Sequence, residues 1–170
     1  MYFGIEDKSI SLFLERLIDG PNNELIIFVC DSVKGEPLSE KTLNAEVYEP
    51  LRKILSNCTE IVPDYNRLYK ICFNNYIMYQ MRNESYAAFD PDEIRIGKGL
   101  LLFEKSRLLG CFNGFSDAYD DGNDVYPAKF KHYGVYTHNH VIDIISHVEP
   151  TIEKVNPKNI ILSEKERRFD

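Results

Sequence analysis

The amino-acid sequence predicts a single α+β domain, residues 1–170, with a mostly antiparallel β-sheet. Three observations lead to this class. The chain has 170 residues, a length at which one hydrophobic core supports a fold without disulfides or metals. Apolar residues near the start recur at helical spacing, whereas from Tyr65 onward they form short runs with a period of two. Because helices and strands occupy separate parts of the chain, we expect two or three helices packed on one side of the sheet.

The first predicted element is a helix over residues 7–19. Its apolar positions share one helical face: Ile10, Phe13, Leu14, Leu17 and Ile18. Gly20 and Pro21 follow directly, and this pair ends a helix because glycine relaxes the backbone and proline lacks an N–H donor.

A strand and a second helical segment come next. Residues 24–31 form a continuous apolar run between two turn-rich stretches, which is typical of a buried strand. Residues 39–58 begin with a capping serine and carry one apolar stripe. Pro50 removes a donor from the middle of this segment, so we expect a kink or two shorter helices.

The second half of the chain predicts an antiparallel meander. Alternating or apolar runs between turn residues give strands over 67–73, 76–89, 94–106 and 130–146, with an edge strand over 150–155. Residues 106–112 suit a helical turn. Residues 113–129 are too rich in glycine, aspartate and asparagine for regular structure, so we expect a loop that serves a function.

Charge narrows the class of partner. With 27 acidic and 20 basic residues, the chain has a net charge of −7, which repels nucleic acid and anionic lipid and favours a basic protein. No basic stretch followed by an apolar stretch opens the chain, and no run approaches the roughly 18 apolar residues of a membrane span. We therefore expect a cytoplasmic protein, with no nucleic-acid or membrane partner.

The four cysteines suggest neither a metal site nor disulfides. Cys30, Cys58, Cys72 and Cys111 are too irregularly spaced for paired zinc ligands or a disulfide framework. We expect reduced thiols, most of them buried.

All four histidines lie between residues 132 and 147. On a strand, His138 and His140 project from one face, which is a geometry that metal ligands use. Zinc requires three or four ligands, however, and the spacing secures only two. Our main expectation is therefore no metal and no cofactor, with both histidines on a half-exposed strand face. The alternative is a small metal-dependent hydrolase that adds Asp143 or Asp117 to the pair.

Other catalytic motifs are missing or incomplete. The sequence contains no phosphate-binding loop, no nucleophile elbow and no catalytic-cysteine signature. Aligned as a calcium loop, the stretch around Gly122 has Tyr119 at the third ligand position and Ala128 in place of the bidentate glutamate. A weak divalent-ion loop stays open, and the main expectation is a protein without enzymatic activity.

Acidic residues gather in two places. No basic residue lies between Arg107 and Lys129, although this stretch contains four aspartates, and a second group precedes Ile94. Aromatic rings alternate with both groups, and rings surrounded by charge are favoured in tight protein interfaces. The predicted partner-binding residues are Asp117, Tyr119, Asp120, Asp121, Asp124, Tyr126, Asp90, Asp92 and Glu93.

Two stretches of the second half, "YQMRNESYAAFDPDEIRIGKGLLLFEKSRLL" (79–109) and "KHYGVYTHNHVIDIISHVEPTI" (131–152), resemble small bacterial immunity proteins of toxin–immunity systems, including those of contact-dependent growth inhibition. The resemblance implies a protein that binds one cognate toxin C-terminal domain and blocks it. It transfers no individual binding residue.

Together these observations lead to one main hypothesis of function. We expect an immunity protein that occludes a basic toxin domain, such as a nuclease, with an acidic and aromatic surface. Two other classes remain as alternatives: the metal-dependent hydrolase and a self-associating structural subunit.

Overall fold

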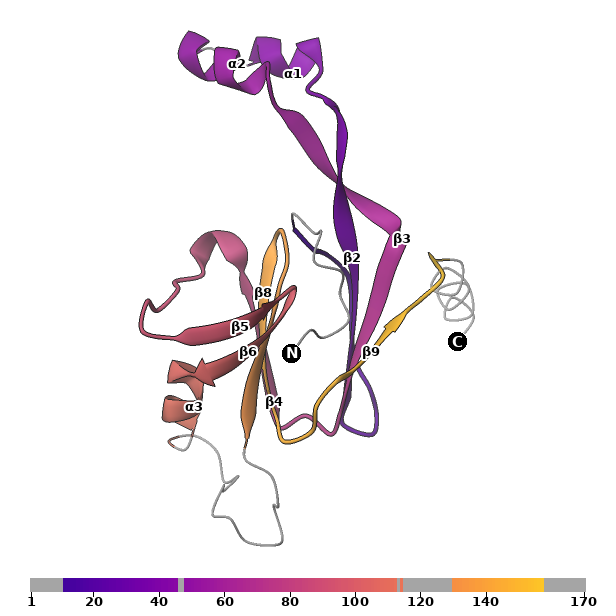
Figure 1. The fold of residues 1–170 in the computed structure, drawn as a ribbon, viewed down its shortest axis with the longest axis vertical. Helices are drawn as coiled ribbons and strands as arrows, with labels where there is room; N and C mark the ends of the chain where they lie inside the picture. Colours follow the sequence, from indigo (N-terminus) through magenta and orange to yellow (C-terminus); the bar gives the residue numbers. More distant parts are fainter. Residues whose placement is uncertain (1–10, 46–47, 113, 115–129, 158–170) are drawn as a thin grey trace, which may run out of the picture.

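The computed structural model describes residues 11–45, 48–112, 114 and 130–157. Two antiparallel sheets form the body of the molecule (Figure 1). The first has the order β1 (Phe13–Asp19), β2 (Glu24–Pro37), β3 (Thr59–Asn74) and β9 (Thr151–Lys154). The second has the order β4 (Met78–Asn83), β8 (His140–Ser146), β7 (Lys131–Tyr136), β6 (Leu100–Lys105) and β5 (Ile94–Lys98). The α+β class and the antiparallel pairing are therefore confirmed.

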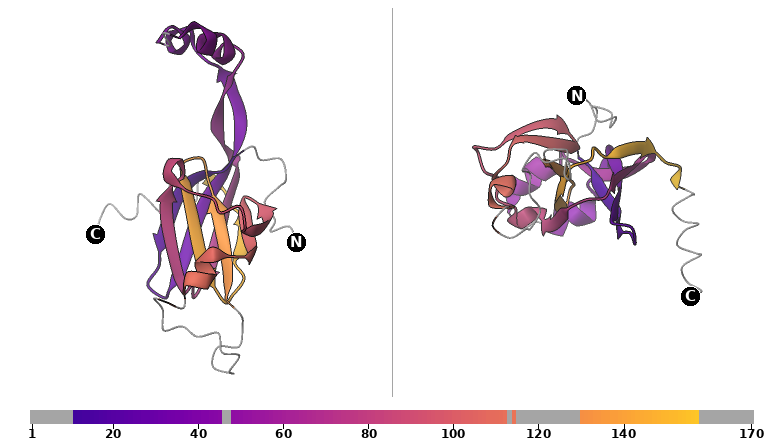
Figure 2. Two further views of the ribbon diagram at one scale, coloured as in Figure 1. Left: turned by 90° about the vertical axis from the view of Figure 1, so that its left-hand side faces the viewer. Right: turned by 90° about the horizontal axis from the view of Figure 1, so that it is seen from below.

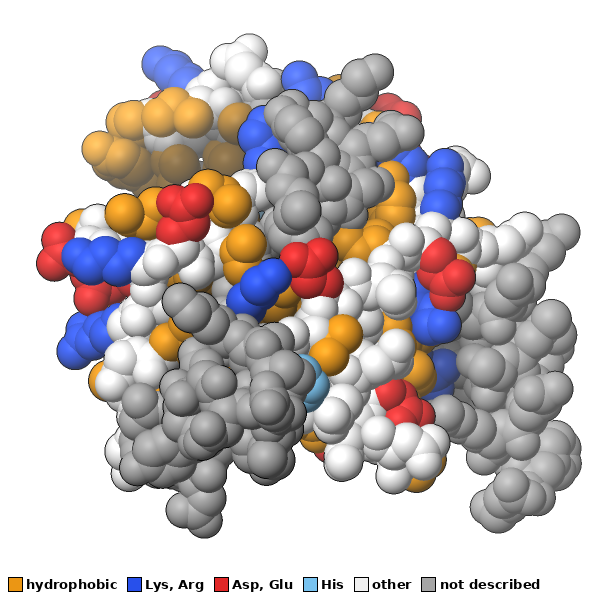
Figure 3. All heavy atoms as spheres, turned by 60° about the horizontal axis from the view of Figure 1, so that its bottom comes forward, with side chains coloured by type: hydrophobic (Ala, Val, Ile, Leu, Met, Phe, Trp, Pro, Cys, Tyr) orange, Lys and Arg blue, Asp and Glu red, His pale blue; other side chains and the backbone are white. Residues whose placement is uncertain are grey.

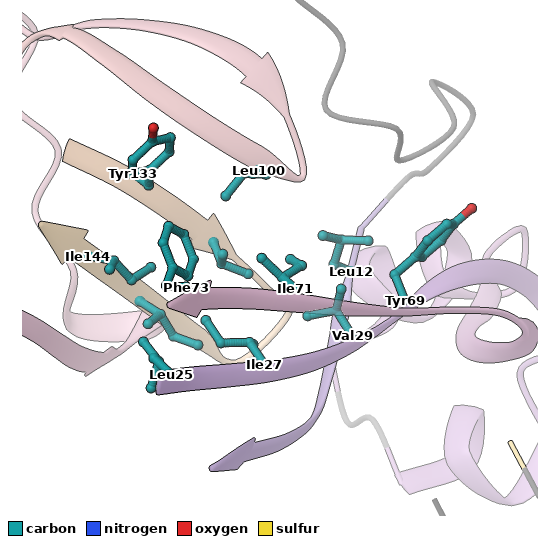
Figure 4. Packing of buried hydrophobic residues seen from close by; sticks show 12 residues of the cluster. Leu12, Leu25, Ile27, Val29, Tyr69, Ile71, Phe73, Leu100, Tyr133 and Ile144 are labelled. Carbon is teal, nitrogen blue, oxygen red and sulfur yellow. The ribbon is translucent and has the colours of Figure 1, made fainter. Parts of the chain in front are cut away.

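The core lies between the two sheets. Alternate residues of β2 and β3, such as Ile27 and Phe73, meet residues of β7 and β8, such as Tyr133 and Ile144 (Figure 4). The Phe73 and Tyr133 rings pack edge to face with their centroids 5.3 Å apart. Both sheets thus bury one face in a shared interior, and the other face of the five-stranded sheet is free to carry polar side chains.

The helix predicted over residues 7–19 is wrong within the described part of the chain, because Phe13–Asp19 forms strand β1. A β-bulge explains the helical spacing. The register shifts between Leu14, which pairs with Val29, and Arg16, which pairs with Phe28. The extra residue brings Leu14 and Leu17 to the same core cluster, although they are three positions apart.

The other predicted strands are present with different bounds. Residues 24–31 and 67–73 lie in the longer strands β2 and β3, and 150–155 contains the edge strand β9. The run 94–106 is split into β5 and β6 at Gly99, and 130–146 is split into β7 and β8 at residues 137–139. The run 76–89 contains β4 and a short 3-10 helix, η1 (Glu84–Tyr86), and the predicted helical turn is α3 (Arg107–Phe112).

The segment 39–58 forms two short helices, α1 (Glu40–Ala45) and α2 (Glu49–Leu55), as Pro50 predicts. Pro50 lies in the first turn of α2, where the missing N–H has no helical acceptor. Neither helix packs on a sheet, contrary to expectation. Both lie at the end of a two-stranded ribbon of β2 and β3 that projects from the body (Figures 1 and 2). Of the three α-helices in the described residues, α3 is the one that lies beside the sheets.

We call residues 33–67 the arm, with residues 38–58 as the arm tip and the flanking ribbon as the stalk. No described residue of the arm is buried, although the arm contains several large apolar side chains. The described residues of the arm therefore form no core of their own.

A cluster of charges holds the foot of the arm. Arg67 contacts Asp31 through Nη1 at 2.6 Å and Asp64 through Nε at 2.7 Å, and its Nη2 donates to the Ser32 carbonyl oxygen at 2.8 Å. Asp31 is fully buried. At this point the register of β2 and β3 shifts, because Cys30 pairs with Leu68 and Asp31 pairs with Asp64. One guanidinium thus neutralises the two facing carboxylates where the ribbon leaves the sheet.

The cysteines are all free thiols, and the expectation that most are buried is wrong. Only Cys30 is buried, while Cys111 is exposed and the other two are intermediate. Burial, together with the neighbouring Glu15, raises the pKa of the Cys30 thiol to about 12. Within the described ranges, no helix has the length and apolar character that a bilayer crossing requires.

Candidate functional site

The predicted partner-binding residues fall into two groups. Asp117, Tyr119, Asp120, Asp121, Asp124 and Tyr126 lie outside the described residues. Asp90, Asp92 and Glu93 lie in a segment that we call the connector, residues 84–93, which joins β4 to β5. Because these strands are the two opposite edges of the five-stranded sheet, the connector passes from one edge to the other (Figure 1).

Local turns shape the connector. Asn83 Oδ1 accepts a hydrogen bond from the Ser85 amide at 3.0 Å and caps η1. Asp90 Oδ1 accepts one from the Asp92 amide at 2.9 Å, across Pro91. These are the side chains that turns favour, so the sequence itself sets this irregular path.

Exposed large apolar side chains are concentrated in the connector and the residues beside it. Among the described residues, ten large hydrophobic side chains are exposed, and four of them lie between residues 81 and 94: Met81, Tyr86, Phe89 and Ile94. Tyr86 is the most exposed of the ten, at 88%. Glu84 and Asp92 are also exposed beside these rings. The connector therefore combines apolar and acidic surface.

The three acids of the connector do not share one role. Asp90 approaches Arg107 Nη1 at 3.5 Å, and Glu93 Oε1 accepts the Arg107 amide at 3.1 Å. These two carboxylates fasten the connector to the start of α3, whereas Asp92 is exposed. Seen from the end opposite the arm, side chains of both charges are interspersed with apolar ones on the described surface (Figure 3).

A pocket of about 530 Å³ lies between the connector, α3 and the sheet. Phe89 and Asp90 of the connector line it together with Arg107 and Cys111 of α3. Its sheet side is lined by polar residues of three strands: Gln80, Arg82, His132, Tyr136 and Asp143. The pocket therefore lies on the face of the sheet that points away from the core.

A hydrogen-bonded chain runs behind this pocket. Ser106 Oγ lies 2.8 Å from His132 Nδ1, and His132 Nε2 lies 3.2 Å from Asp143 Oδ1. Ser106 Oγ also accepts the Leu109 amide at 3.0 Å. The hydroxyl proton is then available to His132 Nδ1, which assigns the ring proton to Nε2 and the role of acceptor to Asp143. The His132 ring stacks on Phe103 with centroids 3.7 Å apart.

Asp143 is the most heavily bonded member of this chain. Its Oδ2 accepts from Gln80 Nε2 at 3.0 Å and from Arg82 Nη2 at 2.8 Å. Burial alone raises the pKa of the carboxyl, but the hydrogen bonds from His132 and Gln80 and the charge of Arg82 outweigh it, so that the pKa lies below its ordinary value. Asp143 is therefore a carboxylate at neutral pH.

This arrangement binds elements together more readily than it performs chemistry. Serine, histidine and aspartate in one chain are the groups of a nucleophilic triad. Here, however, Ser106 caps α3 and does not line the pocket, and both ring nitrogens of His132 are engaged. These hydrogen bonds could relay a proton. In this geometry they anchor α3 and β4 to the centre of the sheet.

The expected strand face with His138 and His140 is wrong. His138 lies in the turn between β7 and β8, where its amide donates to the Leu12 carbonyl oxygen at 2.7 Å and its ring lies 5.2 Å from that of Phe13. His140 begins β8. In the part of the chain that the structure describes, no three His, Cys, Asp or Glu residues are grouped to hold a metal ion.

The pairing of His132 with Asp143 was not predicted, because the apolar pattern of residues 130–146 is that of one strand. The signal was the stretch around Asn139, whose turn residues split the strand into a hairpin. In that hairpin Gly134 pairs with Asp143, which brings His132 and Asp143 onto neighbouring positions of one face.

Comparison with known proteins adds no relative: no family model, no curated protein and no solved structure matches the chain.

Proposed function

We propose that this chain is a partner-binding protein of the immunity type, which neutralises a basic toxin domain by covering it. The observation that carries the proposal is the ring of Tyr86, which is 88% exposed in a connector that also contains the exposed Glu84 and Phe89 side chains. Exposed rings in a group are where protein partners gain most of their binding energy.

Two physical effects support a basic partner. The net charge of −7 attracts a cationic protein over about a Debye length, which raises the association rate. Once the surfaces meet, rings that leave water slow dissociation. Acids such as Asp92 and Glu84 then surround the contact and favour cationic partners over neutral ones.

The metal-dependent hydrolase has less support. His138 and His140 lie in and beside a turn, so the ligand pair on which that alternative rests is not formed on one strand face. His132 and Asp143 line a pocket but are bonded to each other and to their neighbours.

The proposal is tested by calorimetric titration against the C-terminal domain encoded by the reading frame directly upstream. We expect tight binding, and a weakening of about tenfold or more on Tyr86→Ala, since truncating an interface anchor costs about 1–2 kcal/mol or more. Tyr48→Ala removes another exposed ring, on the arm tip, and serves as the matched control. Absence of binding, or equal affinity for wild type and Tyr86→Ala, would contradict the proposal.

The acidic stretch 117–124 gives a second, sequence-based prediction. Replacing Asp117, Asp120, Asp121 and Asp124 with asparagine removes four negative charges and should weaken binding while flattening its dependence on salt. Titrations at low and high ionic strength measure both. Unchanged affinity at the two salt concentrations would remove this loop from the mechanism.

A further inference from the structure

The arm tip carries the second concentration of exposed apolar side chains. Leu51 and Ile54 of α2 are 39% and 64% exposed. Successive residues of a helix are about 100° apart, so these two lie toward one side of α2 and Lys53 lies on the other. No described residue buries this stripe, and α1 and α2 bury no residue of their own. A surface of this kind in so short an element indicates a missing partner.

The stalk does not provide the contact. A bare two-stranded ribbon invites edge-to-edge pairing, and proteins prevent this with proline and charge. The stalk has Pro37 on β2 and Pro63 on β3, neither of which donates a backbone hydrogen bond to an added strand. Lys34, Glu36 and Glu60 add exposed charges. The stalk is therefore protected from association while the arm tip is not.

Charge identifies what meets the arm tip. Residues 38–58 contain three acids and three bases, so the arm tip is neutral, and the other residues carry 24 acids and 17 bases, the whole net charge of −7. Glu49 and Arg52 of α2 already form an ion pair at 3.0 Å. A neutral surface offers no attraction to a basic partner. It is, however, the part of this acidic molecule where two copies approach each other with the least repulsion.

We propose that the arm tip is a self-association surface, through which two copies of this chain form a two-fold dimer with the α2 stripes packed against each other. The same patch serves on both copies, as two-fold symmetry requires. Two helices of six and seven residues bury less than the roughly 1,600 Å² of a standard interface, so the dimer is weak, with a dissociation constant of about 10–100 µM. This surface is separate from the connector, and the two proposals stand independently.

Sedimentation velocity over about 1–500 µM tests the dimer, a range that spans the expected constant. We expect the mass to rise from 19.8 kDa toward twice that value with concentration. The double variant Leu51→Gln, Ile54→Gln should stay monomeric at every concentration, and Lys53→Gln, on the opposite side of α2, should dimerise like wild type. Circular dichroism of each variant confirms that the fold is retained.

Two results would overturn the proposal. A wild-type chain that stays monomeric at the highest concentration shows that the stripe does not join two copies. If a dimer still forms in both the double variant and the arm-tip deletion, its interface lies elsewhere on the molecule. Because the deletion removes the stripe without relying on any substitution in α2, an unfolded double variant does not leave the question open.

Discussion

At the residue scale, the Arg67 guanidinium stabilises the base of the arm, where it contacts Asp31 and Asp64. Arg67 has a side chain only 21% exposed, and its partner Asp31 is fully buried. Asp31 also accepts the Ser32 amide at 2.7 Å, but a buried carboxylate that loses a paired cation keeps its desolvation penalty with less compensation. The neighbouring Asp64 has its pKa held below the ordinary value chiefly by its hydrogen bond from Arg67, so it depends on the same cation.

Arg67→Ala should therefore lower the free energy of unfolding by about 3 kcal/mol, as expected when a buried ion pair loses one member. Chemical denaturation at pH 7 measures the change. The matched control is Lys70→Ala, which breaks an ion pair with the well-exposed Glu153 and should cost less than about 1 kcal/mol. Equal effects of the two variants would show that Asp31 is not held by Arg67 alone.

Asp143 gives a prediction in pH. Its folded pKa lies below the ordinary value of 3.8, so its contribution to stability is fully present above about pH 4 and is lost as the pH falls through the folded pKa. Wild type should lose stability between pH 5 and pH 2, and Asp143→Asn should lose less over that interval. Urea unfolding across this range measures both slopes. Parallel curves for the two proteins would mean that Asp143 is not one of the groups responsible.

The histidines show what a sequence can and cannot give at this scale. All four histidines can be located in the sequence, and the expectation of no metal site followed from their spacing, which secures only two ligands. Which carboxylate meets which imidazole depends on the register of β7 against β8, and a shift of one residue moves every side chain to the other face.

At the element scale, two glycines in the same half of the chain have opposite requirements. Gly97 has φ of +101° in the β5–β6 hairpin, and a Cβ there would collide with the Leu100 carbonyl oxygen. Gly110 lies within α3, where an added Cβ has no neighbour within 4 Å. The first needs glycine and the second only tolerates it.

Gly97→Ala should lower the free energy of unfolding by about 1–3 kcal/mol, because the substitution combines backbone strain with a backbone clash. Gly110→Ala should raise it by up to about 1 kcal/mol through helix propensity. Thermal and urea unfolding of the two single variants compare the signs directly. A stable Gly97→Ala protein would require the hairpin to adopt another turn.

Element types were predictable wherever one period dominated. The split at Pro50 followed from the chemistry of proline, and β9 was predicted as an edge strand. Strand β1 was mistaken for a helix because its bulge converts a period of two into a spacing of three. Bulges depend on the partner strand, so a single strand's sequence does not announce them.

At the scale of the whole molecule, the body and the arm share no core residue among those described. The core cluster draws on both sheets and contains no residue of 33–67. The projecting arm was not predicted, because an amphipathic helix that packs on a sheet and one that projects from the body have the same apolar stripe. Only the length of β2 and β3 carries α1 and α2 away from the body.

Replacing residues 38–58 with Asn-Gly joins Pro37 to Thr59, which already face each other in the ladder, through a two-residue hairpin turn. Because none of the described residues among those removed is buried, the shortened chain should fold with a thermal midpoint within a few degrees of wild type. Scanning calorimetry measures this. A shortened chain that fails to fold would show that the arm supports the body.

The clamp at Arg67 has a further consequence for how the arm works. Arg67 ties β3 to β2 where the ribbon leaves the sheet, so its contacts restrict the movement of the arm before any partner binds. A partner of the arm tip therefore binds a pre-oriented surface, and less conformational entropy is lost on binding. Removing the contacts of Arg67 would leave the residues of the arm tip unchanged and yet weaken binding at the arm tip.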